Sequence, residues 1–143
     1  MKIFLDTNII FKLYYKELES DELTKFIDSN DIVEIFISHL AILEFASTVW
    51  KKSRMNLISI DEAKLFLSIF INDIPKFSII TISNILLNQS LFYLSKYGYQ
   101  GLRTLDSIQL AAAISVKSDC NFFLTSDKLL QTFFLNEGLE VKT

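Results

Sequence analysis

Glycine and proline are scarce in this chain, which has only three glycines and one proline among 143 residues. Their scarcity excludes a collagen-like, linker-rich or low-complexity protein. Hydrophobic residues make up 50% of the sequence, and so apolar a composition excludes intrinsic disorder. The length is typical of one domain, so we expect residues 1–143 to form a single domain with a sizeable core.

Cysteine and histidine occur once each, as Cys120 and His39. A lone cysteine cannot close an intrachain disulfide, and nothing in the sequence points to an oxidising compartment. One histidine and one cysteine also cannot supply the three or four nitrogen and sulfur ligands that zinc normally takes. We expect Cys120 to pack as a small apolar side chain and His39 to lie at the surface or cap a helix.

Positive charge is not in excess, because 14 Lys and Arg stand against 17 Asp and Glu, a net charge of −3. This balance excludes a broad basic face for nucleic acid, but it allows nucleic-acid chemistry at a local, metal-filled acidic site. No stretch of about 18 uncharged apolar residues is long enough for a membrane span. The apolar run at the start is interrupted by Asp6 and is too short for a signal peptide. We therefore expect a soluble cytoplasmic protein.

Short apolar runs alternate with amphipathic segments along the chain. The runs predict strands at 2–5, 34–38, 77–81, 121–124 and 139–142. The segments between them predict helices at 7–15, 19–29, 39–52, 59–74, 83–97, 104–118 and 127–136, the fourth opened by a capping box of Ser59 and Glu62. Such alternation is typical of a parallel sheet covered on both faces. We predict an α/β fold with three α/β/α layers and a central, mainly parallel sheet of about five strands.

Such sheets form their sites beyond the carboxyl ends of the strands, which directs attention to Asp6, Ser38 and residues 125–127, just past three predicted strands. Asp6 directly follows the first predicted strand, and Asp127 follows the fourth. Each could simply cap the helix after it, since aspartate is a favoured N-cap. Asp106 lies in the first turn of a predicted helix, where a negative charge favours the helix dipole. Taken singly, all three therefore have a structural explanation.

Glu44 resists such an explanation. It stands several residues into a predicted helix, between Leu43 and Phe45, and carboxylates are rarely buried without a partner. Lys51 and Lys52 are about two turns further on, too far for an ion pair along the helix. Glu44 therefore either meets a tertiary partner such as Arg103 or faces a cleft.

The four carboxylates have a different meaning if the sheet brings them to one edge. Two unit charges 4 Å apart repel each other by about 4 kcal/mol at an effective dielectric constant of 20. Clustered carboxylates therefore raise one another's pKa or require a cation. Oxygen ligands without histidine or cysteine fit Mg²⁺ or Mn²⁺. Such an ion binds phosphate and activates water for attack on phosphorus, which predicts a phosphodiesterase.

Four segments resemble, in order and spacing, the motifs of the PIN domain, most closely those of VapC-type toxins of toxin–antitoxin modules. They are residues 4–8 (FLDTN), 43–46 (LEFA), 103–113 (RTLDSIQLAAA) and 124–129 (LTSDKL). The resemblance spans residues 2–138 and implies the PIN fold and a metal-dependent endoribonuclease. It also implies a homodimer held inactive by a small antitoxin protein whose tail enters the active groove.

The resemblance further implies roles for individual residues. The residues that gather around Mg²⁺ or Mn²⁺ in the family fall on Asp6, Glu44, Asp106 and Asp127. Glu44 would serve either as a ligand or as the group that orients the attacking water. Asn8 matches the polar residue that supports the first aspartate, and Thr125 matches the hydroxyl residue two positions before the last.

Other residues allow two interpretations each. Arg103 could pair with Asp106 or meet a phosphate, and Lys128 could contact RNA or lie solvated. The segment 63–71 is apolar nearly all round, which favours a subunit or antitoxin interface over packing within the chain. Two further functions remain open: a catalytically silent PIN-like module that binds RNA or protein, and a structure-specific DNA or RNA nuclease.

Overall fold

A computed structural model of the chain describes residues 1–17 and 20–142. Four parallel strands form its sheet, in the spatial order β3-β2-β1-β4. Their bounds are β1 (Lys2–Leu5), β2 (Glu34–Ser38), β3 (Ser78–Ile80) and β4 (Phe122–Leu124). In the two pairings that β1 makes, Ile3 lies opposite Ile35 on β2 and Phe122 on β4. The predicted α/β fold with a parallel sheet is confirmed.

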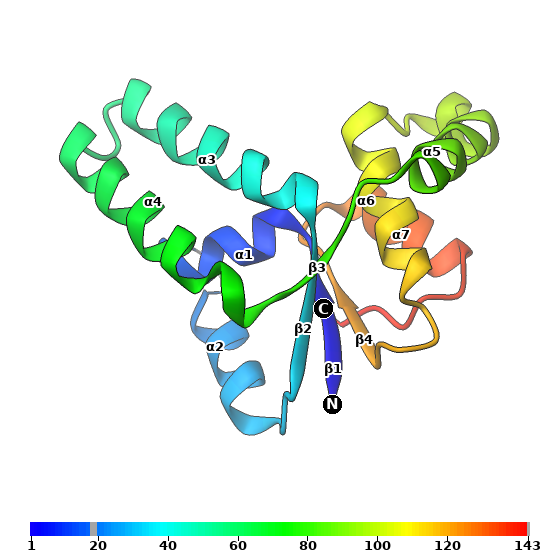
Figure 1. The fold of residues 1–143 in the computed structure, drawn as a ribbon, viewed down its shortest axis with the longest axis horizontal. Helices are drawn as coiled ribbons and strands as arrows, with labels where there is room; N and C mark the ends of the chain where they lie inside the picture. Colours follow the sequence, from blue (N-terminus) through cyan, green and yellow to red (C-terminus); the bar gives the residue numbers. More distant parts are fainter. Residues whose placement is uncertain (18–19, 143) are drawn as a thin grey trace.

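Helices cover both faces of this sheet, as Figure 1 shows. One layer contains α1 (Thr7–Tyr14), α2 (Ser20–Ser29), α3 (His39–Arg54) and α4 (Ile60–Asp73). The other contains α5 (Asn84–Tyr97), α6 (Thr104–Ser115) and α7 (Lys128–Asn136), and two short 3-10 helices, Ile74–Lys76 and Gly98–Gln100, follow α4 and α5. Each helix within the described ranges is too short or too polar to span a lipid bilayer.

The two layers arise from the alternation of side chains along each strand. Ile3 and Leu5 on β1 belong to the core that contacts α1 to α4, whereas Phe4 between them belongs to the core under α5 to α7. All three side chains are fully buried. Each such burial contributes about 1.5–3 kcal/mol, so the alternation holds both helix layers against the sheet.

The fifth predicted strand is wrong. Among the described residues, the segment 139–142 makes only an isolated bridge, in which Val141 lies opposite Phe123. The Phe123 amide donates to the carbonyl of Glu140 (2.9 Å) and its carbonyl accepts from Lys142 (3.2 Å). No second residue pair within residues 20–142 extends this bridge into a ladder.

Most predicted helices are confirmed, with shifted ends. The predicted first residue of the second helix, Glu19, lies outside the described residues. The predicted extension of α6 to residue 118 is wrong, because the Val116 amide turns back to Ala113 and the chain then enters β4. The capping box is confirmed: Ser59 Oγ accepts from the Glu62 amide (3.0 Å), and the Ser59 amide donates to Glu62 Oε1 (3.2 Å).

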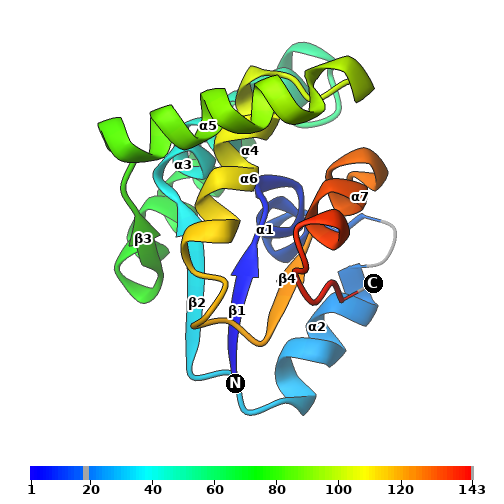
Figure 2. The same ribbon diagram turned by 90° about the vertical axis from the view of Figure 1, so that its right-hand side faces the viewer.

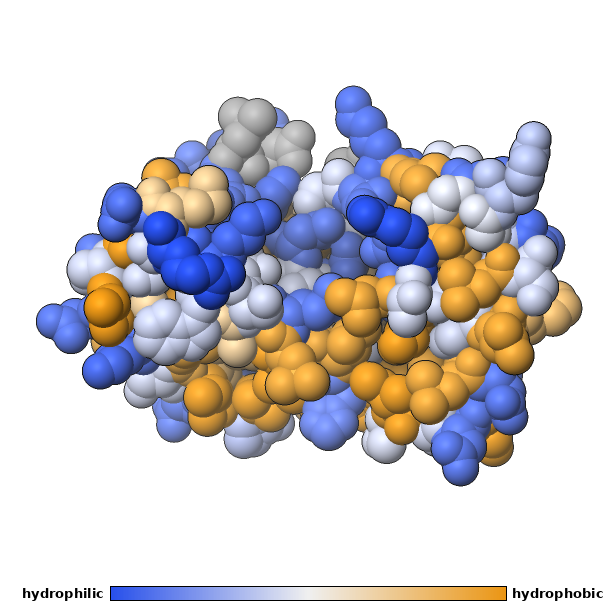
Figure 3. Space-filling model, turned by 90° about the horizontal axis from the view of Figure 1, so that it is seen from above, coloured by the Kyte–Doolittle hydropathy of each residue, from blue (hydrophilic) through white to orange (hydrophobic). Residues whose placement is uncertain are grey.

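The parallel strands all end toward the same side of the molecule. In Figure 2 the strands rise from the N-terminus toward α5 and α6, and β1 passes directly into α1. The segments that follow β1, β2 and β4 therefore lie along one edge. Seen from above this edge in Figure 3, hydrophilic side chains gather in a central hollow, and hydrophobic side chains form a band beside it.

Candidate active site

Asp6 lies at the centre of this edge, directly after β1. Its amide donates to the carbonyl of Leu124 (3.0 Å), which links the ends of β1 and β4. Its carboxylate accepts from the Thr7 amide (2.7 Å) and from Thr125 Oγ1 (2.9 Å), and only 5% of the residue is exposed. Asp6 does cap α1, but two neutral donors are the only hydrogen-bond partners of its carboxylate among the described residues.

Burial raises the pKa of Asp6 to about 7. The hydrogen bonds from Thr125 and Thr7 work in the opposite direction, and they are too weak to compensate. The negative charges of Glu44 and Asp106 raise the pKa further, so both carboxylates are close enough to interact with Asp6. A bound cation would relieve this repulsion.

Glu44 faces the same space from α3. Its Oε1 accepts a hydrogen bond from Thr7 Oγ1 (2.9 Å) and another from Gln109 Nε2 (2.9 Å). Within residues 1–17 and 20–142 it forms no ion pair, with Arg103 or any other cation. The structure therefore supports the interpretation in which Glu44 faces a cleft rather than a cationic partner.

Gln109, like Thr7, is a residue of the candidate site that sequence reasoning missed. It is buried, with 1% exposed, and its Nε2 also donates to Thr7 Oγ1 (2.9 Å). Its Oε1 accepts from Ser38 Oγ (2.9 Å), and Ser38 Oγ in turn accepts from the Ala41 amide as the N-cap of α3. Gln109 thus connects α6 to the helix that carries Glu44. The available signal was a lone amide one turn after Asp106, on an otherwise apolar helix face.

Asp106 and Asp127 approach the space from the opposite side. Asp127 Oδ1 accepts from the Leu130 amide (2.9 Å) and caps α7, and the Asp127 amide donates to Thr125 Oγ1 (3.1 Å). Asp106 is half-buried in the first turn of α6. Burial and the charge of Asp127 raise the pKa of Asp106, while the charge of Arg103 lowers it. The capping interpretation of Asp127 is therefore correct, Asp106 lies in the first turn of α6 as predicted, and the charges of the two carboxylates also interact.

The remaining predicted residues lie at the rim. Asn8 Oδ1 accepts from the Ser126 amide (3.1 Å), which joins α1 to the segment after β4. Arg103, Lys128 and His39 are exposed. Arg103 forms no ion pair with Asp106 within 4.0 Å among the described residues.

All four predicted carboxylates line one cavity of about 420 Å³. Thr7 and Asn8 contribute to its wall, as do Lys51 and Lys52, the latter paired with Glu17 (3.2 Å). As the side chains stand, no three of the described Asp, Glu, His or Cys residues are close enough together to hold a metal ion. The donor atoms offered to the cavity by the four residues are carboxylate oxygens, which fit a hard divalent cation such as Mg²⁺ or Mn²⁺.

The fold matches solved structures of toxin–antitoxin proteins. VapBC2 from Rickettsia felis, bound to a DNA fragment from its promoter, aligns with a TM-score of 0.68 and 17% identity over 99% of this chain and 98% of that chain. FitAcB from Neisseria gonorrhoeae aligns with a TM-score of 0.72 and 18% identity over 99% of this chain and 96% of that chain. VapC20 from Mycobacterium tuberculosis, a toxin that cleaves the sarcin-ricin loop, aligns with a TM-score of 0.69 and 13% identity over 91% of this chain and 93% of that chain. No curated protein gives a significant match.

The model of the PIN domain matches residues 3–132, which is nearly the whole chain. This range begins in β1 and ends in α7, so it contains every residue of the four-carboxylate cavity. Both the sequence and the fold around that cavity thus lead to one conclusion: the chain belongs to the PIN domain family.

Proposed function

We propose that residues 1–143 act as a single nuclease domain, a cytoplasmic Mg²⁺- or Mn²⁺-dependent endoribonuclease that is the toxin of a toxin–antitoxin module. The observation that carries this proposal is the cavity in which Asp6, Glu44, Asp106 and Asp127 meet from four separate segments. Membership of the PIN domain family supports nuclease chemistry for such a cavity. The match to a toxin that cleaves the sarcin-ricin loop favours RNA over DNA.

The four carboxylates would hold the ion, directly or through water. A divalent ion bound there would polarise the phosphate and lower the pKa of a bound water. Thr7 and Thr125 hold the Asp6 carboxylate in place by donating to its two oxygens. Thr7 and Gln109 fix Glu44 in the same way, so that Glu44 can act as a ligand or orient the attacking water. Asn8 ties α1 to the segment that carries Asp127.

The partners of the domain follow from its surface and its structural relatives. The matched structures include the VapBC2 complex on DNA and a toxin–antitoxin complex from Klebsiella pneumoniae, which supports a small antitoxin partner. Large apolar side chains are exposed on α4, where Leu65 and Ile71 are each 60% exposed. Such surfaces mark contacts between proteins, so we assign them to an antitoxin or to a second copy in a homodimer.

The substitution Asp6→Asn tests the proposal directly. Asparagine keeps an acceptor for the Thr7 amide, and it removes the charge that an ion needs. We expect cleavage of labelled RNA in Mn²⁺ to fall at least about 100-fold, the range seen when one charge-stabilising group is removed from an active site. EDTA should abolish cleavage by the unmodified protein.

A matched control is Asp28→Asn, which makes the same change of charge on an exposed residue of α2. This variant should cleave RNA at the rate of the unmodified protein. Equal cleavage by Asp6→Asn and Asp28→Asn, or undiminished cleavage in EDTA, would contradict the proposal. Cleavage of DNA in preference to RNA would contradict the assigned substrate.

A further inference from the structure

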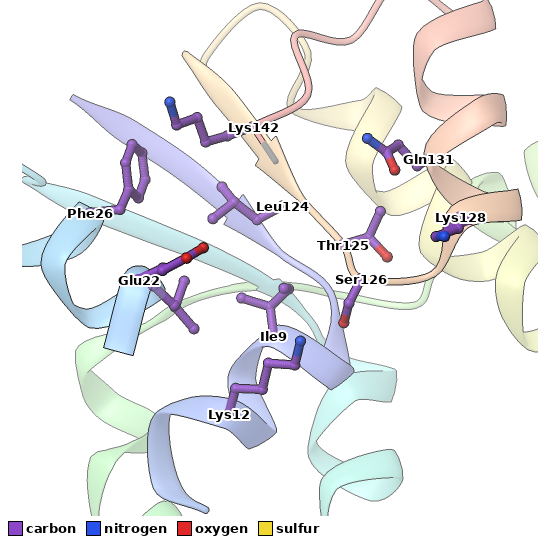
Figure 4. A pocket seen from close by; sticks show the side chains of 11 residues that line it. Ile9, Lys12, Glu22, Phe26, Leu124, Thr125, Ser126, Lys128, Gln131 and Lys142 are labelled. Atoms are coloured by element: carbon purple, nitrogen blue, oxygen red, sulfur yellow. The ribbon is translucent and has the colours of Figure 1, made fainter. Parts of the chain in front are cut away.

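A second hollow lies beside the acidic cavity, between α1, α2 and α7. Its volume is about 300 Å³, at the lower end of the range of roughly 300–1,000 Å³ for ligand sites. We call it the lysine pocket and define it by Lys12, Lys128, Lys142, Glu22, Gln131 and Phe26. Figure 4 shows Glu22 and Phe26 on one side and Gln131, Thr125 and Ser126 on the other, with Leu124 and Ile9 between them.

The charge of the lysine pocket is opposite to that of the acidic cavity. Among the described residues that line it, three are lysines and one is a glutamate, whereas five carboxylates and two lysines line the acidic cavity. Within residues 1–17 and 20–142, neither Lys128 nor Lys142 forms an ion pair. Lys142 Nζ lies 5.5 Å from the centre of the Phe26 ring, which holds the ammonium at the pocket. In a chain with a net charge of −3, this is a local site for an anion.

The pocket also offers surface for a group that is not charged. Leu23 and Leu124 are buried beneath it, and the half-buried Phe26 ring packs edge-on against Phe122 at 6.2 Å. The Gln131 amide and the Ser126 hydroxyl add neutral donors and acceptors at the opposite wall. Apolar and aromatic surface next to lysines is the combination that binds a nucleobase together with its phosphate.

The two hollows are separated by one narrow wall. Thr125 lines the lysine pocket, and its hydroxyl donates to the Asp6 carboxylate (2.9 Å) in the acidic cavity. Ser126 lines the lysine pocket and its amide donates to Asn8, which lines the cavity (3.1 Å). Asp127 and Lys128, adjacent in sequence, face one hollow each. A polyanion bound in the cavity therefore needs only to cross this wall to reach the lysines.

We infer that the lysine pocket binds the nucleotide next to the scissile phosphate of an RNA strand that crosses the wall formed by Asn8 and Ser126. This inference rests on the proposed ribonuclease function. Lys128, next to the wall, and Lys142, on the opposite side of the pocket beside Phe26 (Figure 4), contact the phosphates on the two sides of this nucleotide, and the base lies on the apolar surface around Leu23 and Phe26. The pocket compensates for the repulsion between the substrate and the acidic cavity, and it sets which way the strand runs across the site.

The test is a binding measurement that does not depend on cleavage. Fluorescence anisotropy of a labelled oligoribonucleotide is recorded in EDTA at low salt, with the full chain and the double variant Lys128→Gln/Lys142→Gln. We expect Kd to rise about tenfold, because two phosphate contacts are lost. The slope of log Kd against log salt should fall by about 1 to 1.5, since each contact to a single strand accounts for about 0.7.

The matched control is Lys64→Gln/Lys76→Gln, which removes two exposed positive charges away from both hollows. This variant should bind the oligoribonucleotide like the unmodified protein. The inference is overturned if both double variants have the same Kd and salt slope, or if the unmodified protein shows no saturable binding. It is also overturned if an acidic peptide competes as well as unlabelled RNA.

The outcome separates this inference from the proposed function. If RNA binding depends on Lys128 and Lys142 but the protein fails to cleave RNA in Mn²⁺, the nucleotide site is supported and the ribonuclease function is contradicted. If the protein cleaves RNA only with an intact Asp6, but its affinity for RNA does not depend on either lysine, the ribonuclease function is supported and the nucleotide site is contradicted.

Discussion

The molecule holds carboxylates in two different ways in two different regions. Away from the carboxyl edge of the sheet, lysine partners lie within hydrogen-bonding distance. Lys2 contacts Glu34 (2.8 Å), Lys76 contacts Asp73 (2.8 Å) and Lys96 contacts Glu137 (2.6 Å). Each of these three carboxylates also accepts from a neutral hydroxyl, and the pKa of each is lowered.

At the carboxyl edge the hydrogen-bond partners of the Asp6 and Glu44 side chains are neutral, although Glu17 at the rim of the cavity pairs with Lys52. Thr7, Thr125 and Gln109 donate to Asp6 and Glu44, and burial raises the pKa of both Asp6 and Asp106. Neutral donors fix the direction of a carboxylate but leave its charge uncompensated. The difference between the two regions indicates that the edge depends on a cation from outside the chain, whereas the lysine-paired carboxylates stabilise the fold.

The largest expected effect comes from adding negative charge through Gln109→Glu. The change removes the donations to Thr7 and Glu44 and puts a second carboxylate beside Glu44, in a buried position. Without metal, we expect the free energy of unfolding to fall by about 3–5 kcal/mol, the cost of an unpaired buried charge. Urea unfolding in EDTA measures this loss, and Mn²⁺ should restore part of it.

The matched variant is Gln109→Met, which removes the same hydrogen bonds without adding charge. It should cost about 1–3 kcal/mol for the unsatisfied polar groups, and Mn²⁺ should restore less of this loss. Equal losses and equal recovery in Mn²⁺ for the two variants would show that charge at this edge does not attract the ion.

The second effect depends on pH and comes from Asp6. Its pKa in the folded protein, about 7, is above the ordinary value of 3.8, so the folded state holds the proton more tightly. In EDTA, the stability contributed by Asp6 should therefore be present in full near pH 4 and be lost as the pH rises through 7 to 8. We expect Asp6→Asn to be about 2–4 kcal/mol more stable than the unmodified protein at pH 8 and equal to it at pH 4. Thermal unfolding at the two pH values, with Asp28→Asn as the control, measures this difference in stability. A difference of the same size at pH 4 and pH 8 would contradict the prediction.

The smallest effect is expected in the lysine-paired region. Burial of Glu137 works to raise its pKa, but the hydrogen bonds from Lys96 and Tyr97 outweigh it and lower the pKa. Because Lys96 is exposed, Lys96→Gln should cost only about 0.5–1 kcal/mol at pH 7. The cost should be present in full above the ordinary pKa of glutamate and be lost as the pH falls through the lowered pKa of Glu137 in the folded protein, and stabilisation by Mn²⁺ should not change. A change in Mn²⁺ binding by Lys96→Gln would contradict the proposed difference between the two regions.

Local sequence patterns predicted the elements that pack through their own periodicity. The apolar runs at β1 and β2 and the capping box before α4 are where the sequence places them. The predictions were wrong where long-range pairing decides the outcome. Residues 139–142 have the composition of a strand, but only Val141 finds a partner opposite Phe123. The end of α6 was likewise set by the turn that leads into β4.

The candidate site shows the same division. The predicted strand ends and helix starts singled out Asp6, Asp106 and Asp127, apolar neighbours singled out Glu44, and the resemblance to the PIN domain joined the four. The structure brings all four to one cavity. Gln109 could not be assigned in advance, since its role depends on Ser38 and Glu44, which are 71 and 65 residues away in the chain. The lysine pocket was also unpredictable, because its lysines come from α1, α7 and the segment after α7.

By itself, the sequence determined which kinds of metal ligand this protein can offer. With one histidine and one cysteine, a buried polar site in this chain is built from oxygen ligands, and the apolar strands require helices on both faces. Only the tertiary structure decided which carboxylates are left without a cation. That outcome depends on which side chains meet across the sheet, and such contacts are set by the packing of distant segments rather than by neighbours in the chain.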